Sequence, residues 1–131
     1  GSSFLGPLFI FPRKMIDSLW ENVMYPVIMN LKWQYNRPRP YQLGFRYGFD
    51  IDHIQTETHN TPAYPSGHTA YGAMLASVLS DIYPEYSSDF YKLANVAGRA
   101  RELQGVHYPS DNNAAMVIVS ALWEDVRYDF L

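Results

Sequence analysis

The chain contains no cysteine among its 131 residues, which excludes disulfide bonds, thiolate nucleophiles and cysteine-ligated zinc. It has no apolar run long enough to span a bilayer, because the longest, Ala114 to Trp123, is about half of the roughly 18 residues required. It also has no excess of positive charge: 10 basic side chains stand against 13 acidic ones, and the net charge is −3. This balance argues against a nucleic acid or an anionic membrane surface as the partner.

The N-terminus lacks the features of a signal peptide. The apolar residues 8–11 lie between Pro7 and Pro12, and no charged residue precedes them. Gly1-Ser2-Ser3 is typical of a cloning remnant, which allows a longer native N-terminus. We therefore expect a soluble protein without a transmembrane segment, located in the cytoplasm as the sequence stands, or periplasmic or secreted if a native signal has been removed.

What the sequence does contain is apolar material for one core. Hydrophobic residues make up 47% of the chain and aromatic residues 16%, so a chain of this length can bury the core of a single domain. We expect that domain to cover residues 1–131, apart from the remnant at residues 1–3. So many aromatic side chains on a short chain are also compatible with a homodimer.

The apolar pattern is helical. Apolar residues recur at helical spacing over residues 14–36, where Pro26 should kink or divide the helix. Start and stop signals predict further helices over 66–82, over 87–104 with Ser87, Ser88 or Asp89 as N-cap, and from Pro109 to about Arg127. Residues 37–65 carry four prolines and two glycines, which favours a long ordered loop that shapes the substrate entrance. No segment alternates with period 2, so we expect an all-α fold, a compact bundle of about five helices.

Three short segments contain the residues that could carry chemistry. In the first, Pro65-Ser66-Gly67-His68, the loop enters a helix, so Ser66 can cap the helix and its free N–H groups can bind an anion. Gly67 lets a ligand approach the backbone closely, and His68 can face that ligand as an acid or a base. The alternative for this segment is a capped helix with a surface histidine.

The second segment runs from Arg101 to Asp111. His107 follows the helix stop at Gly105, and Asp111 lies four residues further on. If Pro109 begins a helix, Asp111 can hold one imidazole nitrogen of His107 and leave the other as a nucleophile. The alternative is a polar corner between two helices with Asp111 near a helix start.

The third segment runs from Lys32 to Pro40 and contributes the cations Lys32, Arg37 and Arg39. Arginine forks bind phosphate oxygens in pairs, although a solvated helix end is the alternative for a single basic cluster. We expect no metal site, because the acidic and histidine residues of the loop match no known ligand spacing: Asp50, Asp52, His53, Glu57 and His59.

Together the three segments resemble the type 2 phosphatidic acid phosphatase superfamily, which also includes bacterial class A acid phosphatases and vanadium-dependent haloperoxidases. The pattern of that superfamily is Lys-x6-Arg-Pro, then Pro-Ser-Gly-His, then Ser-Arg-x5-His-x3-Asp. Residues 32–111 follow it with Lys32 and Arg39-Pro40, with Pro65 to His68, and with Arg101, His107 and Asp111. Ala100 stands where the pattern has serine, which removes a hydroxyl but no phosphate ligand.

The resemblance implies a clamp for a phosphate group. Lys32, Arg39 and Arg101 would bind the non-bridging oxygens and stabilise the charge of the transition state. The backbone N–H groups of Ser66 and Gly67, with the Ser66 hydroxyl, would be further donors. The x6 spacing selects Arg39 as the ligand and leaves Arg37 outside the direct phosphate contacts.

The resemblance also implies the reacting groups. His107 would attack phosphorus and form a phosphohistidine, and Asp111 would orient His107. His68 would protonate the leaving alcohol and then activate water in the second step. No divalent metal is needed, because cationic side chains take its place.

The resulting hypothesis is a metal-independent acid phosphatase that hydrolyses small soluble phosphate monoesters, with a phosphate ester or inorganic phosphate as its small-molecule partner and no cofactor. One alternative is a vanadium-dependent haloperoxidase, in which vanadate occupies the same oxyanion pocket bound to His107. The other is a non-catalytic phosphate-binding helical domain, since one fold supports several chemistries.

Overall fold

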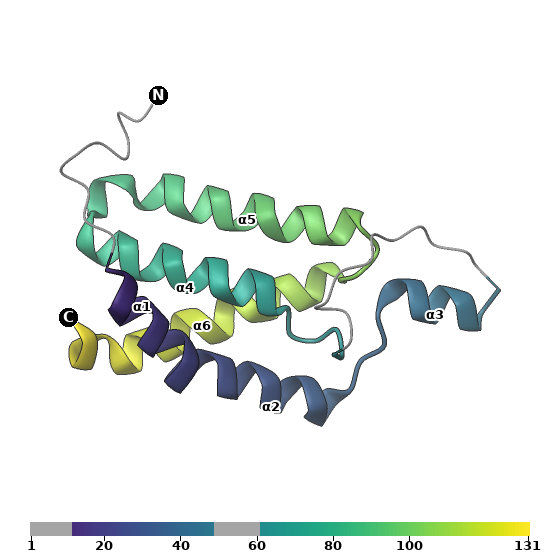
Figure 1. Cartoon of the computed structure of the whole chain (residues 1–131). Coiled ribbons are helices and arrows are strands. Elements are labelled where there is room, and N and C mark those ends of the chain that lie inside the picture. The colour runs from purple at the N-terminus through teal and green to yellow at the C-terminus, as the bar shows by residue number, and fades with distance from the viewer. Residues whose placement is uncertain (1–11, 49–60) are drawn as a thin grey trace.

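The computed structural model describes residues 12–48 and 61–131 (Figure 1). The described residues are helical and contain no strand, as the all-α prediction requires. The acidic and histidine residues at positions 50–59 lie outside the described part, so their expected lack of a metal site stays a prediction.

The first helical run is interrupted next to Pro26. It comprises α1 (Arg13–Leu19), the π-helical turn η1 (Trp20–Met24) and α2 (Tyr25–Tyr35). Pro26 has no N–H to donate to the carbonyl four residues earlier, which disfavours regular α-helical bonding at this point. The Tyr25 N–H bonds instead to the Trp20 carbonyl, five residues back. The predicted division at Pro26 is therefore confirmed, in the form of a π turn.

The predicted loop 37–65 contains a helix that the sequence analysis missed. This helix, α3, spans Pro40–Arg46. Pro40 occupies its first position, where a missing N–H costs nothing. The Arg39 N–H just before it donates to Gln42 Oε1 at 2.8 Å. The expectation of a loop over the whole of 37–65 is therefore wrong, because proline starts a helix here and does not prevent one.

The remaining helices form the body of the fold: α4 (Gly67–Ile82), α5 (Ser87–Leu103) and α6 (Pro109–Phe130). Figure 1 shows α4 and α5 side by side and antiparallel, with α6 against α4. Gly105 ends the α5 region with φ of 74°, as its role as the stop predicts. The N-cap of α5 is Tyr86, not Ser87, Ser88 or Asp89, because a 3₁₀ turn over Pro84–Tyr86 leads directly into this helix.

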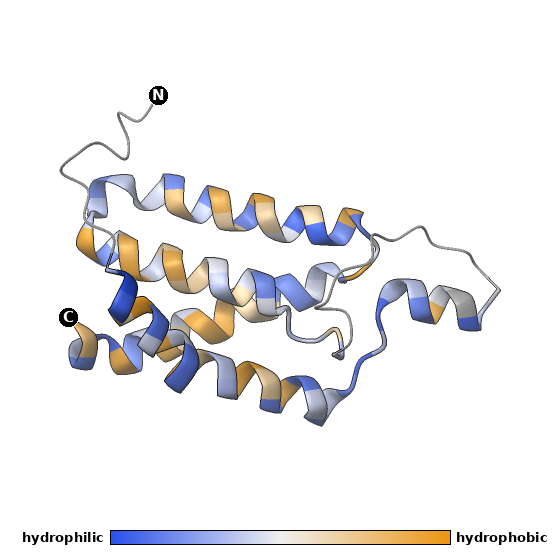
Figure 2. Cartoon of the chain, in the orientation of Figure 1, coloured by the Kyte–Doolittle hydropathy of each residue, from blue (hydrophilic) through white to orange (hydrophobic). Residues whose placement is uncertain are grey.

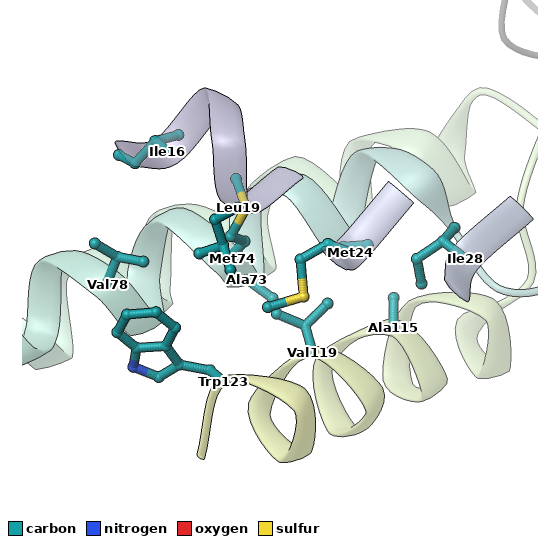
Figure 3. Close-up of a cluster of buried hydrophobic side chains, with 11 residues drawn as sticks. Ile16, Leu19, Met24, Ile28, Ala73, Met74, Val78, Ala115, Val119 and Trp123 are labelled. Atoms are coloured by element: carbon teal, nitrogen blue, oxygen red, sulfur yellow. The ribbon is translucent and has the colours of Figure 1, made fainter. Parts of the chain in front are cut away.

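A single large apolar cluster joins the N-terminal run to α4 and α6 (Figure 3). Its members are fully or almost fully buried: Ile16, Leu19, Met24, Ile28, Ala70, Ala73, Met74, Val78, Ala115, Val119 and Trp123. Trp123 belongs to this core, and its indole N–H donates to Asp81 Oδ2 at 2.8 Å. This packing fixes α2 against the start of α4, where the sequence motifs lie.

A buried polar contact holds the other side of α4. The Asn112 amide donates to the Gly98 carbonyl at 3.0 Å and to Glu102 Oε2 at 2.8 Å, while its oxygen accepts from Thr69 Oγ1 at 2.6 Å. Every polar atom of the Asn112 side chain therefore has a partner, and α4, α5 and α6 are tied together at one point.

The hydropathy along the helices is mixed. Figure 2 shows hydrophilic and hydrophobic residues interleaved along the helices. In the part of the chain that the structure describes, no helix combines the length and the apolar character needed to cross a membrane.

Candidate active site

The three predicted segments meet at one cavity of about 520 Å³. Five of the predicted site residues line this cavity: Lys32, Arg39, Gly67, His68 and His107. The other three are buried: Ser66, Arg101 and Asp111. These residues belong to segments that lie far apart in the sequence: α2, the segment before α3, the start of α4, and the end of α5 with the corner that leads into α6.

His107 and Asp111 form the pair that the spacing predicted. His107 Nδ1 lies 3.1 Å from Asp111 Oδ2, and the Tyr108 N–H donates to the same oxygen at 2.8 Å. Because α6 begins at Pro109, the Asp111 carboxylate turns back toward the imidazole within the first turn. The carboxylate can only accept from the ring, so Nδ1 carries the proton and Nε2 keeps its lone pair.

The cavity environment keeps His107 neutral. Burial lowers the pKa of His107 to about 4, and it outweighs the hydrogen bond that His107 donates to Asp111, which raises this pKa. The neighbouring cation Arg39 lowers this pKa further. Nε2 therefore faces the cavity as an unprotonated nitrogen above about pH 4.

Arg39 lies directly against that nitrogen. Its NH1 group is 2.9 Å from His107 Nε2 and also donates to the Val106 carbonyl at 3.1 Å. Its Nε donates to the Thr61 carbonyl at 3.0 Å, so the guanidinium is held on several sides. Burial and then Arg101 lower the pKa of Arg39 to about 10, which leaves the group charged at neutral pH.

Lys32 is a buried cation among other cations. Only 4% of Lys32 is exposed, and Nζ donates to the Pro62 carbonyl at 2.8 Å. Burial, followed by the charge of Arg39, lowers the pKa of Lys32 to about 7. Arg101, whose pKa is lowered by burial, opposes the charge on Lys32 as well. A bound oxyanion would compensate all three charges at once.

The start of α4 agrees with the sequence analysis in part. Ser66 caps the helix, since its Oγ accepts from the Thr69 N–H at 3.2 Å. The Ser66 backbone N–H donates to the Asp111 carbonyl at 3.0 Å in this structure, and its expected role as a phosphate donor stays a prediction. Gly67 begins the helix and faces Lys32, where an added Cβ would lie 3.8 Å from Lys32 Cε. A site for an oxyanion at the helix start therefore depends on Gly67 and the residues after it.

His68 lies at the exposed side of the cavity. Partial burial, Arg101, Arg39 and Lys32 all lower the pKa of His68 below its usual value. An imidazole beside the phosphate position, open to solvent, can exchange protons with a leaving group or with water.

Arg37 has a larger role than the sequence analysis gave it. Its NH1 group donates to Asp111 Oδ1 at 2.7 Å and to Ser110 Oγ at 2.7 Å. Its guanidinium also lies over the Tyr64 ring, 4.6 Å from the centroid. The two oxygens of Asp111 are thus divided between Arg37 and His107. The x6 spacing, which placed Arg37 outside the phosphate contacts, contains no signal for this ion pair.

The sequence analysis also missed the apolar wall of the cavity. Trp20, Tyr25, Met29 and Tyr71 line it together with the charged residues. Trp20 packs against the apolar core and also reaches the cavity. Spacing could have indicated this wall, because positions 25, 29 and 32 follow one face of a helix.

The structure shows no clustered metal ligands in residues 12–48 and 61–131. No group of three His, Asp or Glu side chains is placed there to hold a metal ion. Among these described residues, the charged ones that line the cavity are cations, a donor set that fits an oxyanion and not a metal ion.

Comparison with known proteins agrees with this arrangement. Residues 19–124 match the family model of the PAP2 superfamily. The chain is 35% identical to a non-specific acid phosphatase of Salmonella typhimurium over 108 residues, which cover 79% of this chain and 41% of that protein. It is 32% identical to a non-specific acid phosphatase of Providencia stuartii over 110 residues, 82% of this chain and 43% of the relative. The chain thus spans less than half the length of these curated relatives. Since the family model covers most of the chain and includes all three motif segments, the chain belongs to the PAP2 superfamily.

Proposed function

We propose that this chain carries the active site of a phosphomonoesterase that works without a metal ion, through a phosphohistidine at His107. The observation that carries the proposal is the unprotonated Nε2 of His107, which faces the cations Arg39 and Lys32 while Asp111 holds Nδ1. The names of the relatives, non-specific acid phosphatases, support the same reaction.

The first step begins when the phosphate group enters the cationic end of the cavity. Lys32, Arg39 and Arg101 donate to its non-bridging oxygens, and the Arg39 NH1 group moves its hydrogen bond from His107 Nε2 to the phosphate. The lone pair of Nε2 then forms a bond to phosphorus as the phosphorus–oxygen ester bond breaks. His68, protonated, gives its proton to the departing alkoxide.

Asp111 stabilises the intermediate. When Nε2 binds phosphorus the imidazole becomes positively charged, and the carboxylate 3.1 Å from Nδ1 compensates that charge. In the second step the neutral His68 takes a proton from water, whose oxygen forms a bond to phosphorus. The bond between nitrogen and phosphorus breaks, inorganic phosphate leaves, and His107 returns to its neutral form.

The two alternative functions use the same pocket and need no cofactor other than vanadate. Vanadate has the shape and charge of phosphate, so the same cations could hold it with His107 as its ligand. No contact in the cavity favours oxidation of a halide over ester hydrolysis, whereas the relatives' names favour hydrolysis.

The test is an aryl phosphate assay on purified protein with a chelator present. We expect turnover that vanadate inhibits, and we expect no turnover in His107→Gln. The matched control is Arg99→Gln, because Arg99 is a neighbouring cation whose side chain is 74% exposed. In His68→Gln the second step should be slow, so a phosphoenzyme should accumulate. A label on histidine survives base and is lost in acid, and its absence in the double variant with His107→Gln identifies the residue.

Absence of hydrolysis from about pH 4 to pH 8, the range in which a histidine acid and base should work, would refute the proposal. Bromide oxidation with vanadate and peroxide would support the haloperoxidase, and phosphate binding without either activity would support the non-catalytic domain. Homodimer formation and cellular compartment stay predictions.

A further inference from the structure

The cavity extends well past the position of the phosphate group. Its cationic end contains Lys32, Arg39 and His107, whereas Trp20, Tyr25, Met29 and Tyr71 line the rest. Tyr25, Met29 and Lys32 follow one face of α2, and Gly67 and Tyr71 follow one face of α4. The cavity is therefore a groove between these two helices that begins at the phosphate site. Along the axis of α2, Tyr25 lies about 10 Å from Lys32, toward the N-terminus of the helix.

The apolar end of the groove is built from aromatic edges and faces. The Trp20 and Tyr71 rings meet edge to face, with centroids 5.1 Å apart, and the Trp20 and Tyr25 rings are tilted with centroids 5.8 Å apart. Tyr25 remains 47% exposed, so this end is open to a ligand. Trp20 is the first residue of the π turn, which widens the helix at the point where the wall forms.

The chemistry of the groove is uneven along its length. Among the described residues that line it, all of the charge lies at the phosphate end. The far end consists of aromatic rings and a thioether, and its polar atoms are the two tyrosine hydroxyls and the indole N–H. A sugar or another polyol placed there would exchange water for few partners, which is unfavourable for its hydroxyl groups. An aromatic group would bury apolar surface and could pack against the rings in the geometry that they already use with one another.

We propose that Trp20, Tyr25, Met29 and Tyr71 form a leaving-group subsite that selects phosphate monoesters of alcohols with an aromatic or similarly bulky apolar group. This inference rests on the proposed phosphatase function, since it names the substrate class of the same site. The volume of about 520 Å³ lies in the range of small-molecule pockets, and it exceeds what a phosphate group alone would fill.

The experiment compares two primary alkyl esters, 2-phenylethyl phosphate and ethyl phosphate. Both release a primary alcohol of similar acidity, so a difference in kcat/KM reports contacts to the ring and not leaving-group chemistry. We expect the wild-type protein to prefer the phenylethyl ester by about tenfold or more, the size of one well-packed aromatic contact. Tyr25→Ala and Trp20→Ala should each lower that ratio.

The matched control is Trp33→Ala, because Trp33 lies on α2, is 58% exposed and is not part of this groove. Its ratio should equal that of the wild type. Tyr25→Ala keeps the test decisive if Trp20→Ala fails to fold, since Tyr25 is about half exposed and is not a member of the core cluster. Circular dichroism confirms that each variant is folded.

Binding of the two corresponding phosphonates, followed by calorimetry, separates failure of this inference from failure of the proposed function. Suppose that neither ester is hydrolysed, that the phenylethyl phosphonate binds more tightly than the ethyl phosphonate, and that Tyr25→Ala removes this difference. The subsite then stands and the phosphatase does not. If both esters are hydrolysed equally well, or if the ratio is the same in wild type and both variants, the subsite is overturned and the phosphatase stands.

Discussion

Replacing Lys32 by methionine should stabilise the fold while it abolishes phosphate binding. The Lys32 ammonium is almost fully buried and lies close to Arg39 and Arg101. Burial and these charges lower its pKa from 10.5 to about 7, so the charged form is far less favourable in the fold than in the unfolded chain. Methionine has a similar length and carries no charge.

The size of the effect follows from the pKa of Lys32. A fall from 10.5 to about 7 corresponds to about 5 kcal/mol of lost stability below pH 7, at 1.36 kcal/mol for each pH unit. The substitution also leaves the buried Pro62 carbonyl without its donor, which costs about 1–3 kcal/mol. We expect a net gain of about 2–4 kcal/mol, a rise in Tm of roughly 10 °C for a chain of this size.

The gain should depend on pH in a defined direction. Between the folded pKa of about 7 and the unfolded value of 10.5 the unfolded chain binds more protons at Lys32, so wild-type stability rises with pH through this window. Lys32→Met lacks this dependence. Its advantage should therefore be largest at about pH 6. Near pH 9.5 the lowered pKa costs the wild type only about 1.4 kcal/mol, which the unpaired Pro62 carbonyl offsets, so the advantage should disappear.

The assay is thermal unfolding followed by circular dichroism in buffers that contain no phosphate or other oxyanion. Lys92→Met is the control, because Lys92 is an exposed lysine on α5 whose loss should leave Tm and its pH dependence unchanged. Added inorganic phosphate should raise the Tm of the wild type and not that of Lys32→Met. A lower Tm for Lys32→Met at about pH 6, or a gain that is the same at both pH values, would refute the reasoning.

Further predictions concern the pH profile, the ion pair behind the nucleophile and the contact between helices. The kcat/KM profile should fall below about pH 4, where His107 becomes protonated, and should fall again above the pKa of His68, which lies below 6.5. Activity that does not fall below about pH 4 would contradict the His107 assignment, and activity that stays constant up to about pH 8 would contradict the His68 assignment. Arg37→Gln removes a 2.7 Å ion pair with Asp111, so kcat/KM should drop about tenfold or more. The acid side of the pH profile should move to higher pH, because the unpaired Asp111 charge would raise the pKa of His107. An unchanged acid side would show that Arg37 does not act through Asp111. Gly98→Ala would place a Cβ 2.8 Å from Thr69 Oγ1, so urea unfolding should show a loss of about 1–3 kcal/mol. An unchanged urea midpoint would mean that α4 and α5 move apart at Gly98 without a measurable loss of stability, which would contradict the prediction.

The sequence determined the helices and the motif residues, because both are encoded over short distances. Apolar spacing, the Ser66 cap and the Gly105 stop placed α4 and α5 closely, and Pro26 indicated the break that became η1. The missed helix α3 is only 7 residues long. A helix of that length depends on partners elsewhere, such as the Gly105 carbonyl that accepts from the Tyr41 N–H at 3.2 Å.

The tertiary structure alone decided the electrostatics of the site and the shape of its groove. Asp111, four residues from His107, favours a raised pKa, yet burial among distant segments lowers it to about 4. The partner of Arg37 is Asp111, which lies 74 positions later in the chain. No local pattern contains such information, because desolvation and charge pairing depend on which atoms distant segments bring together. The sequence therefore identified the reacting residues, and the packing of α2 against α4 decided their charge states and the groove beside them.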